Sequence, residues 1–206
     1  YSGLCVGFKI VTNVADEIGT AAVAPGRITI VDPRFEWEGR PWPHTQNPML
    51  LPPFGLEMER EIHYGRLEAA KVFAAANGLN RVTLDTPEAW LGLVAAGKTY
   101  YDLREALREL GLDDAALRQH GIRILKIGMM YPMEPSIARH FARGLEEILV
   151  VEEKRSFIEM FLRDTLYNDA VHPRIVGKRD EQGRPLVPAN GELDADRIAQ
   201  LVASRL

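Results

Sequence analysis

The chain has 206 residues, of which 46% are hydrophobic and 26% charged, and its formal net charge is −4. This balance is typical of a folded globular chain and excludes intrinsic disorder, while the acidic surplus disfavours nucleic acid and anionic membranes as partners. The single cysteine, Cys5, excludes an intrachain disulfide framework and any iron–sulfur or zinc site that is built from cysteines.

The first third of the sequence changes composition twice. Apolar residues recur at helical spacing in the first 23 residues, at Val6, Ile10, Val14 and Ile18. Seven of the thirteen prolines then fall within residues 24–56. Because proline removes backbone donors and restricts the residue before it, we predict a helical tail over residues 1–23 and an extended linker over residues 24–56.

From residue 57 onward, short apolar runs alternate with amphipathic stretches. The strands that we expect lie at residues 81–84, 90–96, 122–127, 148–151 and 174–177. Helices are expected between and after them, two of which open on capping boxes at Asp102 with Glu105 and Ser156 with Glu159. This alternation predicts an α/β domain over residues 57–206, with a mostly parallel sheet of about five strands and helices on both faces.

Residues 92–99 match the phosphate-loop template G-x-x-x-x-G-K-[S/T]. In such a loop the octet is a turn whose backbone donors surround phosphate oxygens. Here the four residues between the two glycines, Leu-Val-Ala-Ala, predict a strand instead. One hypothesis is therefore a nucleotide-binding and hydrolysing domain that uses Gly92–Thr99 with Glu152 or Glu153. A milder hypothesis places a weak anion site at Gly97, Lys98 and Thr99, in a strand-to-helix turn.

Four charged residues follow the strand expected at residues 148–151, namely Glu152, Glu153, Lys154 and Arg155. Adjacent carboxylates at a strand end can serve acid–base catalysis or bind a cation, but they can equally pair with the two cations or contact a neighbouring domain. We predict that these four residues make inter-domain contacts. The sequence identifies no catalytic residue and no metal ligand, because the five histidines show no metal-ligand spacing.

Three stretches resemble the transketolase C-terminal-type domain of the 2-oxoacid:ferredoxin oxidoreductases, and most of all the long, fused indolepyruvate ferredoxin oxidoreductases. They are residues 92–102, 124–132 and 144–155, and residues 2–9 similarly resemble the tail of a preceding pyrimidine-type domain. The block from Glu152 to Arg155 and the Gly97-Lys98 turn are the most specific marks of this resemblance.

The resemblance implies a parent enzyme that oxidatively decarboxylates an aryl 2-oxoacid such as indolepyruvate to an acyl-CoA. It further implies thiamine diphosphate, Mg²⁺, coenzyme A and iron–sulfur clusters, with ferredoxin as the electron acceptor. The Gly-Asp-Gly motif and the cysteine groups of such enzymes are not found in these 206 residues. The implied role is therefore a non-catalytic scaffold or interface domain, and the isolated chain is expected to be inactive.

The chain begins at Tyr1 rather than at a methionine, no signal-peptide pattern follows, and no apolar run approaches about 18 residues. We therefore expect a piece of a longer polypeptide, without a membrane partner. A chain with a single cysteine fits a reducing compartment, and we therefore expect a cytoplasmic location. The expected partners are the other domains of the parent, with ferredoxin reached through them, and the resemblance implies a homo-oligomeric parent.

Overall fold

The computed structural model of the chain describes residues 1–7, 16, 18–21, 23–24, 26–43, 47–170 and 172–206. These residues form two compact units, Tyr1–Asn77 and Gly78–Leu206. No helix within the described ranges is long and apolar enough to cross a membrane.

The first unit consists of a short hairpin and a helical segment. Its elements are β1 (Phe35–Trp37), β2 (Arg40–Trp42), α2 (Phe54–Glu61), the π-helical turn η1 (Ile62–Arg66) and α3 (Leu67–Ala76). The hairpin packs on the helical segment at Gly65, where an added Cβ would lie 3.1 Å from the Trp37 ring and 3.3 Å from the Trp42 ring. The two tryptophans thus anchor the hairpin to the helical segment, and a side chain at position 65 would crowd both rings.

This packing corrects two expectations about the first third of the chain. The predicted extended linker, residues 24–56, contains the β1–β2 hairpin and the start of α2, because the tryptophans give it an apolar surface to bury. The compact domain predicted from residue 57 begins instead at Gly78. Of the helix predicted over residues 1–23, Ile10 and Val14 lie outside the described residues, while Val6 and Ile18 belong to no helix.

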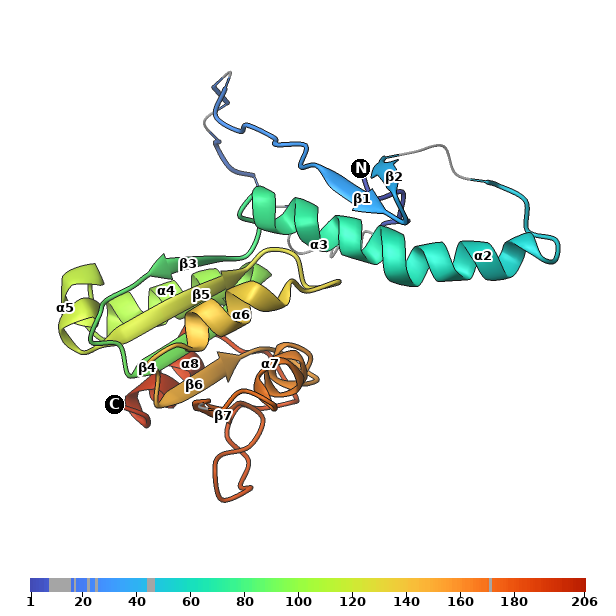
Figure 1. The fold of residues 1–206 in the computed structure, drawn as a ribbon. Coiled ribbons are helices and arrows are strands. Elements are labelled where there is room, and N and C mark those ends of the chain that lie inside the picture. Colours follow the sequence, from blue (N-terminus) through green and yellow to red (C-terminus); the bar gives the residue numbers. More distant parts are fainter. Residues whose placement is uncertain (8–15, 17, 22, 25, 44–46, 171) are drawn as a thin grey trace. The chain divides into compact units, whose positions relative to one another are not determined.

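The second unit is built on a five-stranded sheet with the order β3–β5–β4–β6–β7 (Figure 1). The strands are β3 (Arg81–Leu84), β4 (Leu91–Ala96), β5 (Ile122–Ile127), β6 (Glu147–Val151) and β7 (Arg174–Val176). Strands β4 to β7 run parallel, and β3 pairs antiparallel with β5 at one edge. The predicted α/β class and the mostly parallel sheet are therefore confirmed.

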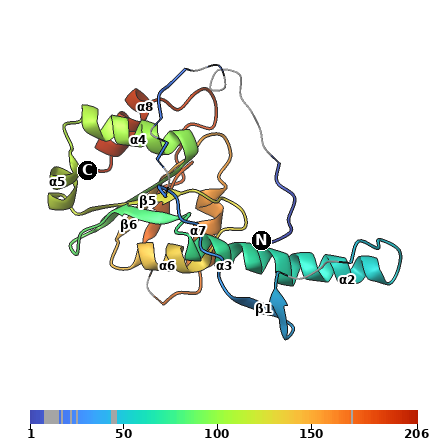
Figure 2. The ribbon, with the colours of Figure 1, turned by 90° about the horizontal axis from the view of Figure 1, so that it is seen from above.

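Helices cover both faces of this sheet, as the sequence predicts. They are α4 (Gly97–Glu109), α5 (Asp114–Gln119), α6 (Pro135–Ala142), α7 (Ile158–Leu166) and α8 (Ala195–Ala203). Figure 2 shows α4 and α8 on one side of the sheet and α6 and α7 on the other. Because successive strand residues point to opposite faces, Leu93 and Ala95 of β4 pack with the α4–α8 layer and Val94 with the α6–α7 layer.

Both predicted capping boxes are wrong. Helix α4 begins at Gly97, whose φ of +54° lies in the left-handed region that glycine adopts easily. Asp102 therefore lies inside the helix, where it accepts a hydrogen bond from Lys98 instead of capping. Helix α7 begins at Ile158 without a contribution from the Ser156 side chain. Helices α5 and α6 each end just before a glycine with positive φ, Gly121 and Gly144.

Candidate functional site

The carboxyl ends of β4 and β6 lie side by side in the middle of the sheet. The chain leaves β4 into α4 on one face and leaves β6 into α7 on the other face (Figure 2). Open α/β sheets bind ligands at such a topological switch point. A cavity of about 260 Å³ lies there, and we call it the crevice; it is lined by Ala96, Thr99, Met130, Val151, Glu152, Glu153, Arg155, Phe157 and Ile158.

The octet that matches the phosphate-loop template is largely a strand. Residues 92–95 pair with β5 on one side and with β6 on the other, so their backbone groups belong to the sheet. Gly92 has a packing role, because an added Cβ would lie 2.5 Å from the Leu145 side chain and 2.6 Å from the Phe141 ring. The hypothesis of a phosphate loop is therefore wrong, since these backbone donors cannot also surround a phosphate.

The packing around Gly92 yields a prediction. Gly92→Ala is expected to lower the free energy of unfolding by about 1–3 kcal/mol, because Phe141 and Leu145 must move to admit the methyl group. Urea denaturation followed by circular dichroism measures the change. Gly19→Ala, where the added Cβ meets open space, serves as the control and is expected to change stability by less than about 0.5 kcal/mol. Equal effects of the two substitutions would contradict the packing role.

The three residues of the predicted anion site are not brought together in the crevice. Thr99 lines it, whereas Gly97 and Lys98 do not. The Lys98 ammonium lies 2.9 Å from Asp102 Oδ2 and 3.8 Å from Glu192 Oε1, and the hydrogen bond to Asp102 raises the pKa of Lys98. Anion binding at Gly97–Thr99 stays a prediction.

The Glu152 carboxylate caps helix α7. Its Oε2 accepts hydrogen bonds from the backbone N–H of Phe157 (3.0 Å) and Ile158 (2.9 Å), and its Oε1 accepts one from Glu159 (3.1 Å). A negative charge at this end also complements the helix dipole. The sequence pattern missed this cap because Glu152 lies farther upstream than a capping-box residue. Glu152 is itself buried, with 7% of its surface exposed.

Glu153 and Lys154 form hydrogen bonds with the segment that precedes α8. Glu153 Oε1 accepts a hydrogen bond from the Leu193 N–H (3.0 Å), and Lys154 Nζ donates one to the Gly191 carbonyl (2.7 Å). Lys178 connects the same two parts of the unit, because its ammonium donates hydrogen bonds to the carbonyls of Glu152 and Pro188. Burial lowers the pKa of Lys178, against the opposite influence of nearby carboxylates.

Arg155 differs from its three neighbours. Its side chain is exposed and lines the crevice, and within the described part of the chain it makes no hydrogen bond or ion pair with another side chain. Of the four residues predicted to contact other domains, Glu152, Glu153 and Lys154 are thus engaged inside the unit. Contacts of this block with another domain stay a prediction, and Arg155 is the member free to make them.

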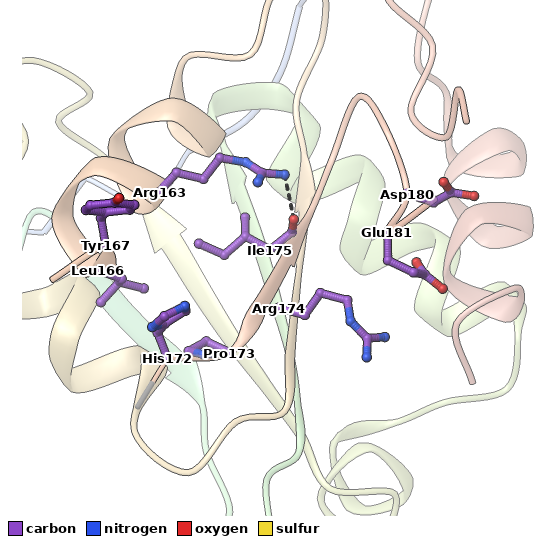
Figure 3. A pocket seen from close by; sticks show the side chains of 9 residues that line it. All are labelled: Arg163, Leu166, Tyr167, His172, Pro173, Arg174, Ile175, Asp180 and Glu181. Atoms are coloured by element: carbon purple, nitrogen blue, oxygen red, sulfur yellow. Dashed lines mark hydrogen bonds between the residues drawn. The ribbon is translucent and has the colours of Figure 1, made fainter. Parts of the chain in front are cut away.

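A larger cavity of about 520 Å³ lies beside the edge strand β7 (Figure 3). Its charged side chains are paired within the unit: Arg163 with Glu159, Arg174 with Glu147, Asp180 with Arg184 and Glu181 with Arg205. Arg163 also donates a hydrogen bond of 2.7 Å to the Ile175 carbonyl on the edge strand. These side chains therefore stabilise the edge of the sheet, and we assign no ligand to this cavity.

The donor atoms of the chain do not fit the inorganic groups that the resemblance implies. An iron–sulfur cluster needs several cysteine thiolates, and Cys5 is the single cysteine of the sequence. Magnesium needs oxygen ligands, but both Glu152 oxygens already accept backbone hydrogen bonds. Across the described ranges, no group of three or more His, Cys, Asp or Glu residues is placed to hold a metal ion.

Comparison with known proteins identifies relatives of the second unit. A family model described as "Indolepyruvate oxidoreductase domain" matches residues 81–206. Indolepyruvate oxidoreductase subunit IorA of Methanothermobacter marburgensis is 32% identical over 123 residues, which is 60% of this chain and 18% of that subunit. The subunit of the same name from Archaeoglobus fulgidus is 25% identical over 175 residues, which is 84% of this chain and 24% of that subunit. The chain thus spans about a fifth of the length of these relatives.

Two solved structures are also similar to the chain. A split-gene transketolase in an inactive tetramer has 18% identity and a TM-score of 0.42, with 61% of this chain and 40% of that chain covered. The 2-oxoglutarate:ferredoxin oxidoreductase from Magnetococcus marinus has 17% identity and a TM-score of 0.46, with 76% and 24% covered. At these scores the two likenesses support no statement about function.

Proposed function

The chain belongs to the indolepyruvate oxidoreductase domain family, and on this premise we propose that it is a non-catalytic domain of a 2-oxoacid:ferredoxin oxidoreductase. The proposed whole enzyme oxidatively decarboxylates an aryl 2-oxoacid such as indolepyruvate to an acyl-CoA and passes the electrons to ferredoxin. Other parts of that enzyme hold thiamine diphosphate, Mg²⁺ and the iron–sulfur clusters. The family match over residues 81–206 and the relatives named as IorA subunits support this enzyme class.

The strongest support for the non-catalytic role is the hydrogen bonding of the Glu152 carboxylate. Both of its oxygens accept backbone hydrogen bonds at the start of α7. Freeing a buried carboxylate from such partners is costly, since hydrogen bonds to charged groups contribute about 1.5–3 kcal/mol each. A group held in this way stabilises the carboxyl edge of the sheet and is poorly placed to contact a substrate or hold a metal ion.

A rigid domain of this kind contributes to catalysis through geometry. We propose that it holds the cofactor-binding domains of the same polypeptide in register, because small displacements of reacting groups slow a reaction strongly. Its partners are then those domains, with ferredoxin contacted through them, in a homo-oligomeric enzyme. The exposed Arg155 at the carboxyl edge is the residue of the charged block that is available for such contacts.

The test compares the isolated chain with the full-length enzyme that contains it. Both are assayed for indolepyruvate-dependent reduction of ferredoxin, with thiamine diphosphate, Mg²⁺ and coenzyme A supplied. We expect turnover by the full-length enzyme and none by the isolated chain. Turnover by the isolated chain would contradict the non-catalytic role. A full-length enzyme that oxidises a different 2-oxoacid and not indolepyruvate would contradict the substrate alone.

A further inference from the structure

The crevice has the size and the walls of a site for a small, partly apolar molecule. Its volume of about 260 Å³ lies just below the range of about 300–1,000 Å³ that holds drug-sized ligands. Its apolar lining comes from Ala96, Met130, Val151, Phe157 and Ile158. Val151 and Ile158 are fully buried, whereas Met130 and Phe157 are 41% and 44% exposed. The crevice therefore has a closed apolar floor and an open apolar rim.

Three polar side chains of the lining retain unused binding capacity. Arg155 makes no ion pair within the described ranges. Glu153 forms no ion pair there either, and its single hydrogen bond, to the Leu193 N–H, uses Oε1. The hydroxyl of Thr99 has no hydrogen-bond partner among the described residues. The crevice thus presents one guanidinium, one carboxylate and one hydroxyl group beside an apolar surface.

Two lysines lie close enough to Glu153 for electrostatic attraction, Lys98 and Lys178, but neither forms an ion pair with it. Glu152 also lines the crevice, but both of its oxygens accept backbone hydrogen bonds. Lys98 lies on the adjoining turn and is paired with Asp102 and Glu192. A purely anionic ligand is therefore attracted by Arg155 and repelled by Glu153, and a purely cationic ligand meets the reverse. A ligand that carries both charges can pair with both side chains.

We propose that the crevice binds a free α-amino acid with an aromatic or other apolar side chain. Its carboxylate pairs with Arg155, its ammonium group pairs with Glu153, and its side chain contacts Met130 and Phe157. The proposal concerns binding alone and goes beyond the proposed enzyme reaction, because it assigns a ligand site to this chain's own residues. The binding test below therefore gives its answer whatever the substrate of the whole enzyme is.

The ligand class is tested by NMR titration of the ¹⁵N-labelled chain. The probes are L-phenylalanine, 3-phenylpropanoate, which has no ammonium group, 2-phenylethylamine, which has no carboxylate, and glycine, which has no side chain. We expect saturable shifts at residues 96–99 and 153–158 with L-phenylalanine, and binding weaker by about tenfold for each probe that lacks one charge. Equal affinity for 3-phenylpropanoate, or no saturable shift with L-phenylalanine, would overturn the proposal.

Two substitutions test the assigned residues. Arg155→Gln and Glu153→Gln are each expected to raise the dissociation constant for L-phenylalanine by about tenfold, the effect of losing one charge-assisted contact. The glutamine at position 153 can still accept the hydrogen bond from Leu193, so the fold is retained, and thermal melts check this. Arg108→Gln, at the far end of α4 and 73% exposed in its side chain, is the control and should leave the affinity unchanged. Unchanged affinity in both crevice variants would contradict the site.

Discussion

Replacing Arg205 with methionine is expected to lower the free energy of unfolding of the second unit by about 3–5 kcal/mol. Arg205 Nε donates a hydrogen bond of 2.6 Å to Glu147 Oε1, and its terminal nitrogen donates to the other oxygen. Glu147 opens β6 and is 5% exposed. The substitution leaves this carboxylate buried with Arg174 as its remaining cation, 3.3 Å away and 56% exposed in its side chain. The hydrogen bond to Glu147 also raises the pKa of Arg205 above its ordinary value.

Urea denaturation of the variant and the parent chain measures this loss. Arg108→Met, which removes an exposed guanidinium, is the control and should change stability by less than about 0.5 kcal/mol. The double variant Arg205→Met with Glu147→Leu should regain part of the loss, because no unpaired buried charge remains. A loss for Arg205→Met no larger than that of the control would show that this ion pair does not hold the C-terminal segment.

Glu152→Ala is expected to lower the free energy of unfolding by about 2–3 kcal/mol, since three backbone N–H groups at the start of α7 lose their acceptor. Glu152→Gln should lose less, because an amide oxygen can still accept from one or two of these donors. The matched control is Glu146→Ala, at an exposed position six residues before Glu152 and immediately before β6.

Thermal and urea denaturation measure the stability of the three variants. Amide hydrogen exchange shows which part of the chain is destabilised. Exchange at Phe157, Ile158 and Glu159 should accelerate in Glu152→Ala and stay slow in Glu146→Ala. If Glu152→Ala were as stable as the parent chain, the carboxylate would have no structural role and would again be a candidate for acid–base chemistry.

The three central strands of the second unit, β4, β5 and β6, could be predicted from the sequence because each is a short, mainly apolar run with both faces buried. The residues of β4 show this well: Leu93 and Val94 lie on opposite faces and both are fully buried. Such strands read as continuous apolar runs. The same property explains the misleading phosphate-loop match, since Gly92 is small to admit Phe141 and Leu145 rather than a phosphate.

The helix starts were harder to predict, because local patterns compete with partners that the fold brings close. Ser156 and Glu159 match a capping box, yet Glu159 is buried and accepts a hydrogen bond of 2.9 Å from the Lys178 N–H. Glu152 caps the helix in its place. The division between the units was missed for a similar reason, since the packing of Trp37 on Gly65 depends on a contact between distant residues.

The central claim is that this chain supports the proposed oxidoreductase structurally and contributes no reacting group. The most direct test measures kcat of the full-length enzyme with Glu152→Ala, at a temperature where the variant is fully folded, beside its melting temperature. A purely structural role of Glu152 predicts a lower melting temperature and a kcat within about twofold of the parent enzyme. A kcat that falls by about a hundredfold or more, the effect of removing a general acid or base, with an unchanged melting temperature would contradict it.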